Sequence, residues 1–273
     1  MYESLYKSKS GRRIAAFMAK PFISRAAGRL MDSRLSALFI RPFVKKNAID
    51  LTEALPVKYK TFNQFFTRKL VEGARPIIAD ESALASPCDG LLTVYPVTED
   101  GVFIVKGTPY TMETLIEDKS LAASFLGGYI LIFRLTPSHY HRYAFPDKGE
   151  IIASKRIPGV FHTVRPEALK ALPVFKTNTR EYTLLKTASF GCMLFMEVGA
   201  TMVGRIKNTK TSGAFSRGNE KGMFEFGGST IILALEKNTL IPRKEFIENS
   251  LKETESPIRL GECVGFKDTH EKA

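Results

Sequence analysis

Short β-rich runs dominate the chain from about residue 80 onward, and each is bounded by glycine, proline or aspartate. The clearest of them cover residues 91–95, 102–105, 129–133, 193–198 and 229–235. A single helix, over residues 111–121, is expected to interrupt them. Strands and helices do not alternate, which argues against a doubly wound parallel sheet. The pattern therefore predicts an α+β fold with a strand-rich, mainly antiparallel core. With 273 residues, of which 44% are hydrophobic, the chain is long enough to bury such a core.

The segment before this core is strongly basic and has helical periodicity. Residues 1–47 contain eleven lysines and arginines against only Glu3 and Asp32, so they carry most of the formal net charge of +12. Apolar residues recur there at helical spacing, namely Ile14, Phe17, Met18, Met31, Leu35, Leu38 and Phe39. The pattern predicts basic amphipathic helices that break near Pro21 and Pro42. We expect a membrane-associating helical region at residues 1–70 and a core domain at residues 71–273.

A basic amphipathic helix can bind an anionic membrane surface, with its apolar face among the lipids and its cations near the headgroups. The simpler alternative is a solvated charged face that packs on the protein's own core. Nucleic acid attracts the same charge, but the sequence has neither zinc-finger spacing nor an aromatic RNA-binding signature, so no nucleic-acid partner is expected. The sequence lacks both an apolar run of about 20 residues and a signal-peptide pattern. We therefore predict a peripheral protein on the cytoplasmic face of the cell membrane.

The cysteines argue against a disulfide framework and against zinc. Cys88, Cys192 and Cys263 are far apart in the sequence and show no CxxC spacing. They are expected to be ordinary thiols in a reducing cytosol.

The step Gly227-Gly228-Ser229-Thr230 opens the last long apolar run. Glycine lets the backbone adopt strained conformations, and the serine hydroxyl can attack the preceding carbonyl and convert the amide into an ester. β-Elimination of that ester would cut the chain between Gly228 and Ser229 and leave dehydroalanine, which tautomerises to an imine and hydrolyses to a pyruvoyl group. In isolation, however, such a string before a strand is more often a plain turn.

The cut would need groups that move protons beside Ser229. Asp89 and His141 are the candidates, and His139 comes next. An Asp-Gly pair such as Asp89-Gly90 is by itself usually a turn. His139 and His141 would share one face of a strand, as paired metal ligands do, but without further ligands no metal site is predicted.

Several segments, taken together and in order across residues 61–235, resemble the phosphatidylserine decarboxylase family. Thr61 to Leu70 is similar to the family's F-N-x-F-F-x-R segment, and Ser86 to Gly90 to its S-P-x-D-G segment. The remaining matches are Lys106 to Leu115 (K-G-x-x-Y-S/T-x-x-x-L), Pro137 to Arg142 (P-x-D-Y-H-R), Val198 to Gly204 (V-G-A-x-x-V-G) and Lys221 to Thr230 (K-G-x-x-x-x-F-x-x-G-S-T).

The resemblance implies a self-cleaving decarboxylase. Cleavage at Gly228–Ser229 would give a β chain (1–228) and an α chain (229–273) that stay together, and Ser229 would become a covalent pyruvoyl cofactor with no external cofactor needed. Through a Schiff base, the pyruvoyl group would decarboxylate phosphatidylserine to phosphatidylethanolamine. Asp89 would be the acidic member of the proteolytic triad. The resemblance also leaves room for a homodimer.

The sequence departs from the family pattern at two positions. Ala144 stands where the family commonly has the second histidine of the triad, and His139 stands where it usually has aspartate. His141 could do both jobs, His139 or His162 could take over the lost role, or the chain could no longer be processed. Ala144 motivates one alternative function, a non-processing, membrane-binding paralogue. Another is a pyruvoyl-dependent decarboxylase of a soluble amino acid, because the resemblance includes family members with that activity.

Overall fold

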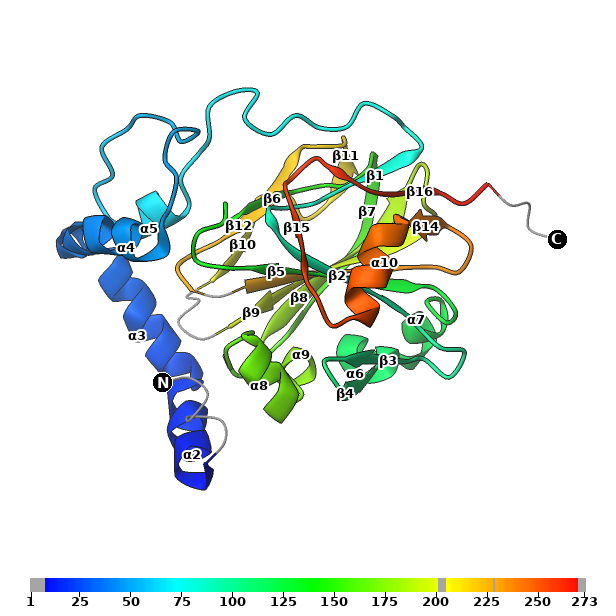
Figure 1. Cartoon of the computed structure of the whole chain (residues 1–273), viewed down its shortest axis with the longest axis horizontal. Coiled ribbons are helices and arrows are strands. Elements are labelled where there is room, and N and C mark those ends of the chain that lie inside the picture. Colours follow the sequence, from blue (N-terminus) through cyan, green and yellow to red (C-terminus); the bar gives the residue numbers. More distant parts are fainter. Residues whose placement is uncertain (1–7, 201–204, 228, 270–273) are drawn as a thin grey trace.

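The computed structural model describes residues 8–200, 205–227 and 229–269. Its centre is a large antiparallel sheet in the order β11-β7-β8-β9-β13-β5-β2-β15 (Figure 1). These strands are β2 (Gly90–Pro96), β5 (Tyr129–Leu135), β7 (Gly149–Ile157), β8 (Arg180–Thr187), β9 (Cys192–Gly199), β11 (Gly213–Phe215), β13 (Ser229–Leu235) and β15 (Ser256–Ile258). The predicted α+β class with a mainly antiparallel core is confirmed, and β13 is buried along its whole length.

Smaller sheets complete the strand-rich part of the chain. One contains β10 (Ile206–Asn208), β12 (Glu220–Phe224) and β6 (Arg142–Ala144), and another contains β1 (Ala83–Ala85), β16 (Cys263–Lys267) and β14 (Leu240–Pro242). The third is the hairpin of β3 (Val102–Val105) and β4 (Thr108–Thr111). The β-rich runs of the sequence all lie in strands, β2, β3, β5, β9 and β13, as predicted.

The two faces of the large sheet are covered differently. On one face, Tyr143 of β6 packs on Phe195 of β9, with 5.9 Å between ring centroids. On the other, Arg180 of β8 donates to the carbonyl of Leu115 in α6 (Met112–Ile116) at 2.8 Å. Figure 1 shows β6, β10 and β12 on one side of the sheet and α6, α8 (Pro166–Ala171) and α9 (Val174–Thr177) on the other. The sheet is therefore a middle layer.

The prediction of a single helix over residues 111–121 is wrong, because two short helices cover this region. The structure has α6 and, after a break, α7 (Lys119–Ala123). Glu117 ends α6 in the left-handed conformation, with φ of 55°. Asp118 then caps α7, because its side chain accepts a hydrogen bond from the Leu121 N–H at 2.9 Å. Another helix, α10 (Lys244–Leu251), packs on β2 near the C-terminus.

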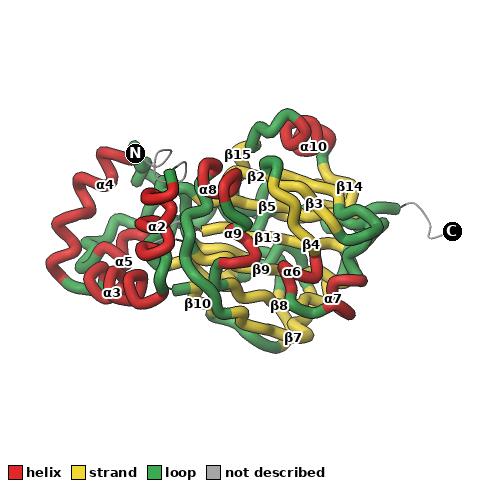
Figure 2. Tube along the Cα trace, turned by 90° about the horizontal axis from the view of Figure 1, so that it is seen from below, coloured by secondary structure: helices red, strands yellow, loops and turns green. Residues whose placement is uncertain are grey.

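The basic N-terminal segment is helical, as predicted. It contains α2 (Lys9–Met18), α3 (Pro21–Met31), a 3₁₀ helix, η1 (Arg34–Phe39), and α4 (Ile40–Asn47), and is followed by α5 (Phe62–Phe66). Pro21 and Pro42 lie in the first turns of α3 and α4, where no intrahelical N–H bond is lost. Figures 1 and 2 show these helices gathered at one end of the molecule. No helix in the described part of the chain is long and apolar enough to cross a bilayer.

A phenylalanine cluster attaches these helices to the rest of the protein. Its buried members are Met31, Ile49, Phe62, Phe65 and Phe66, and Phe43 and Phe226 pack against them. The ring centroids of Phe62 and Phe226 are 4.8 Å apart. The segment just before Ser229 is therefore held against the N-terminal helices.

Glu197 and Lys221 form a fully buried ion pair between β9 and β12. The Lys221 ammonium also donates to Oδ1 of Asn208 at 3.0 Å. We expect Lys221→Met to lower the free energy of unfolding by about 3–5 kcal/mol, because the carboxylate loses its partner in the interior. Urea denaturation measures this loss. The double variant Lys221→Met/Glu197→Gln should recover a large part of it, and no recovery would contradict this account of the pair.

Candidate active site

The sequence-predicted site residues converge on one end of the large sheet. Ser229 is the first residue of β13 and lies between Leu135, the last residue of β5, and Gly199, the last residue of β9. Beyond β5 lies β2, which begins one residue after Asp89. Because neighbouring strands are about 4.8 Å apart, the starts of β13 and β2 lie on the order of 10 Å from each other.

Ser229 faces the layer formed by β6 and β12. Its partner Gly199 lies two residues from Glu197 on β9, so Ser229 shares the sheet face on which Glu197 meets Lys221. The side chain of Ser229 is fully buried, and its Oγ has no hydrogen-bond partner among the described residues. A buried hydroxyl without a partner is rare in proteins and costs stability, which points to a chemical role.

The chain reaches Ser229 by crossing from β12 in one layer to β13 in the other. Gly227 within this crossing has a φ of 142°, a conformation that side-chain-bearing residues rarely adopt. Gly228, the residue on the carbonyl side of the predicted cut, lies outside the described residues.

His139 and His141 do not share a strand, and that expectation is wrong. Residues 136–141 form a loop between β5 and β6, with a turn closed by a 3.0 Å hydrogen bond from the His139 N–H to the carbonyl of Thr136. The proline at position 137 cannot donate to a strand ladder, which favours a turn here. The two imidazoles consequently lie in different surroundings.

His141 is fully buried against the ring of Phe66, with 3.9 Å between ring centroids. Its Nδ1 is 2.9 Å from the carbonyl oxygen of His139, so Nδ1 carries the proton and donates it. Nε2 is then a free acceptor, and it has no partner among the described residues. Burial, reinforced by the positive charge of Arg68, lowers the pKa of His141 well below its usual value. The neutral imidazole can act as a base.

His141 also borders the crossing that leads to Ser229. Its carbonyl accepts a hydrogen bond from the Phe224 N–H at 2.9 Å, at the end of β12. Phe226, two residues further on, packs against the Phe66 ring that also covers His141, with 5.4 Å between centroids. His141 therefore contacts the start of the short segment that ends at Ser229.

The imidazole of His139 has the opposite hydrogen-bond pattern to that of His141, because its Nδ1 accepts rather than donates. Its Nδ1 accepts the N–H of Thr136 at 3.0 Å, which leaves the proton of the neutral ring on Nε2. Burial lowers the pKa of His139, and the negative charge of Asp89 partly opposes that shift. In this geometry the neutral ring is a hydrogen-bond donor through Nε2.

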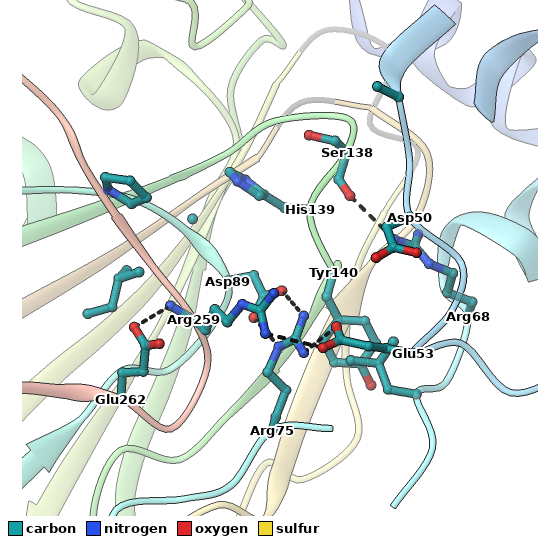
Figure 3. Close-up of a pocket in the computed structure, with 15 residues that line it drawn as sticks. Asp50, Glu53, Arg68, Arg75, Asp89, Ser138, His139, Tyr140, Arg259 and Glu262 are labelled. Atoms are coloured by element: carbon teal, nitrogen blue, oxygen red, sulfur yellow. Dashed lines mark hydrogen bonds and ion pairs between the residues drawn. The ribbon is translucent and has the colours of Figure 1, made fainter. Parts of the chain in front are cut away.

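Asp89 is fixed by Arg75. The Arg75 Nε and Nη2 donate to the two oxygens of the Asp89 carboxylate at 2.8 and 2.7 Å, and the Leu260 N–H donates to Oδ1 at 2.9 Å. Arg75 also pairs with Glu53 at 2.7 Å. Asp89 and His139 line one pocket of about 440 Å³, shown in Figure 3.

His162 lies on the other side of Ser229, beyond β9. The buried amide of Asn178 accepts from the His162 N–H at 3.0 Å and donates to the carbonyls of His162 and Gly199 at 2.7 and 2.8 Å. The Nδ1 of His162 is buried and has no partner among the described residues, and burial lowers the pKa of this ring. One buried side chain therefore ties His162 to the strand partner of Ser229.

Sequence reasoning gave no role to Arg68, Arg75 or Glu53. Arg68 belongs to the segment that resembles F-N-x-F-F-x-R, which was a usable signal. Arg75 and Glu53 carried none, because an isolated charge in a loop does not reveal its partner. Within the described residues, no three or more His, Cys, Asp or Glu side chains are grouped as metal ligands.

A pocket that gathers a carboxylate, an imidazole and guanidinium groups at the end of a sheet is typical of an enzyme. The family model for phosphatidylserine decarboxylase matches residues 62–266 of this chain. A phosphatidylserine decarboxylase proenzyme of Fusobacterium nucleatum is 40% identical over 267 residues, covering 96% of this chain and 89% of that protein.

Two further relatives agree with this match. Phosphatidylserine decarboxylase proenzyme 2 of Clostridium acetobutylicum is 38% identical over 96% of this chain and 90% of its own length. The phosphatidylserine decarboxylase proenzyme of Clostridium novyi is 39% identical over 96% of this chain and 91% of its own length. The chain belongs to the phosphatidylserine decarboxylase family, which confirms the resemblance found in the sequence.

Proposed function

We propose that this chain is the precursor of a phosphatidylserine decarboxylase that cuts itself between Gly228 and Ser229. The observation that carries the proposal is the fully buried, unpartnered hydroxyl of Ser229 at the sheet end where Asp89 and the histidine loop converge. A serine hydroxyl that is buried and forms no hydrogen bond is free to react, as the precursor of a pyruvoyl cofactor must be. The pyruvoyl group formed from Ser229 supplies an electron sink for the loss of carbon dioxide.

In this proposal, His141 is the base of the cutting reaction. Its free Nε2 takes the hydroxyl proton of Ser229, because Nδ1 is committed to the carbonyl of His139. His139 lines the pocket that it shares with Asp89, and the Nε2–H of its neutral ring is proposed to donate a hydrogen bond there. Asp89, held by Arg75, orients this part of the site. His162 is a secondary candidate on the opposite flank of Ser229.

The test is the purified full-length protein on a denaturing gel, followed by mass spectrometry and a decarboxylation assay. We expect two fragments, residues 1–228 and 229–273, with a blocked pyruvoyl N-terminus on the smaller one. The fragments should remain associated and convert phosphatidylserine to phosphatidylethanolamine. An intact chain would support the non-processing paralogue instead. Cutting without lipid turnover, but with turnover of free serine, would support a decarboxylase of a soluble amino acid.

We further propose that residues 1–70 dock the core, residues 71–273, on an anionic membrane from the cytoplasmic side. The proposal is supported by large apolar side chains left at least half exposed on the N-terminal helices: Ile14 (55%), Phe17 (53%), Phe22 (53%), Leu30 (52%), Leu35 (73%), Leu38 (75%) and Phe39 (52%). Basic residues lie between them in the sequence. This combination is that of an interfacial helix. A homodimer remains a prediction.

Leu35→Ser/Leu38→Ser should weaken binding to phosphatidylserine-containing vesicles by at least about tenfold, because two exposed apolar side chains would no longer enter the lipid. The thermal midpoint should change little, since both side chains are exposed on the helices. Vesicle co-sedimentation measures the binding. Leu251→Ser is the matched control, because Leu251 is 79% exposed on α10, outside the N-terminal helices. Equal losses in both variants would contradict a docking role for these helices.

A further inference from the structure

Arg68 is a buried cation with unused hydrogen-bond donors. Its residue surface is 4% exposed, and its guanidinium lies over the ring of Phe65 at 5.5 Å from the centroid. One nitrogen, Nη2, donates to the carbonyl of Ser138 at 3.3 Å. Nε and Nη1 are buried and have no partner among the described residues. Burying a guanidinium in this way is costly unless an anion completes its hydrogen bonds.

No carboxylate among the described residues forms an ion pair with Arg68, and two acidic groups of the same pocket are already paired with other arginines. Asp89 is within electrostatic reach, but its carboxylate is gripped by Arg75 and by the Leu260 N–H. Glu53 pairs with Arg75 and with Arg259, at 2.7 and 3.2 Å. The guanidinium of Arg68 is therefore left for a ligand to pair with.

The position of Arg68 suits a lipid headgroup. Arg68 lies two residues after the end of α5 and lines the same pocket as Asp89 and His139. The pocket lining includes Ala48 and Asp50, which follow the C-terminal end of α4, so the pocket adjoins the N-terminal helices (Figure 3). The Ser138 carbonyl bound by Arg68 is three residues beyond Leu135, the strand partner of Ser229, and hence within about 10 Å of it along the chain.

We propose that Arg68 binds the phosphodiester of the lipid headgroup, an inference that rests on the function proposed above. A guanidinium matches phosphate oxygens with paired, charge-assisted hydrogen bonds. The serine carboxylate is the less suitable partner, because its negative charge is lost with carbon dioxide. An arginine that held it would stabilise the ground state more than the transition state. The phosphodiester is unchanged by the reaction.

The experiment compares full-length wild type with Arg68→Gln, and with Arg156→Gln as a control that removes the same charge from an exposed site on β7. All three should cut themselves and melt cooperatively. For Arg68→Gln we expect the KM for phosphatidylserine in mixed micelles to rise at least about tenfold with kcat within about threefold, since binding common to ground and transition states is lost. Arg156→Gln should keep both constants.

Direct binding makes the test independent of turnover. Glycerophosphoethanolamine, which carries the phosphodiester but no carboxylate, should bind to wild type in calorimetry and at least about tenfold more weakly to Arg68→Gln. If wild type binds glycerophosphoethanolamine but does not decarboxylate phosphatidylserine, the proposed function is contradicted, whereas the phosphodiester site at Arg68 is still supported. Turnover with an unchanged KM and unchanged glycerophosphoethanolamine affinity in Arg68→Gln would overturn the inference alone. If Arg68→Gln does not fold, Arg68→Met, which keeps the apolar stem, is subject to the same criteria.

Discussion

Ser229→Ala is expected to leave the chain in one piece and to reduce phosphatidylserine decarboxylation below detection. Alanine has no hydroxyl to attack the preceding carbonyl, and no pyruvoyl group can form from it. Gel electrophoresis of the freshly purified variant and release of labelled carbon dioxide measure the two effects. Folding should be preserved to within about 1 kcal/mol, because the hydroxyl that is removed has no hydrogen-bond partner to lose.

Thr230→Val is the matched control for this variant. Thr230 is the next residue along β13, is fully buried, and also has a hydroxyl without a partner among the described residues. Its side chain points to the opposite face of the sheet, because successive residues of a strand alternate. Valine has the same shape, so cutting should continue. Full cutting of Ser229→Ala, or an uncut but folded Thr230→Val, would contradict the assignment of Ser229.

His141→Asn is expected to slow self-cleavage by at least about a hundredfold, whereas His139→Asn should keep it within about tenfold. The difference follows from the hydrogen bonds. An asparagine at position 141 can still donate to the His139 carbonyl but has no basic nitrogen, and one at position 139 can still accept the Thr136 N–H. Cell-free synthesis sampled over time gives the rates. The reverse ranking would transfer the role of base to His139.

The pH dependence of self-cleavage should also identify His141 as the base. The base must be neutral, and burial lowers the pKa of His141 well below its usual 6.5. The rate should therefore stay level as the pH falls through about 6.5 and decrease only at lower pH, where the imidazole becomes protonated. A midpoint at or above 6.5 would show that a different, more exposed group is titrating.

Local signals predicted a large part of the fold. The runs that became β2, β5, β9 and β13 are apolar because they are inner strands of the large sheet and are mostly buried, so their composition reports their environment. The run that became β3 lies in the hairpin with β4, where buried and more exposed residues alternate. The sequence pattern did not predict strands β7 and β8. β7 exposes most of its side chains and contains Glu150, Lys155 and Arg156, and it is a strand because β8 pairs with it.

The candidate site also contains some residues that local sequence motifs predict and some contacts that only the folded chain shows. Ser229 and Asp89 could be proposed from short motifs, because the chemistry of a glycine–serine step and of an acidic turn is local. The Arg75–Asp89 pair joins residues 14 apart, and the contact of Arg68 with Ser138 joins residues 70 apart. The paired histidines were misplaced, because their predicted strand is a turn that contains Pro137.

By itself, the sequence determined the α+β class, the helical basic N-terminus and the family, and it pointed to Ser229 as the candidate nucleophile. Those conclusions depend on residue type and spacing, which folding does not alter. Only the tertiary structure decided which imidazole nitrogen is free, which carboxylate is already paired and which arginine is not. Hydrogen-bond partners and burial fix these properties, and both arise from segments that are distant in the chain and meet at the end of the sheet.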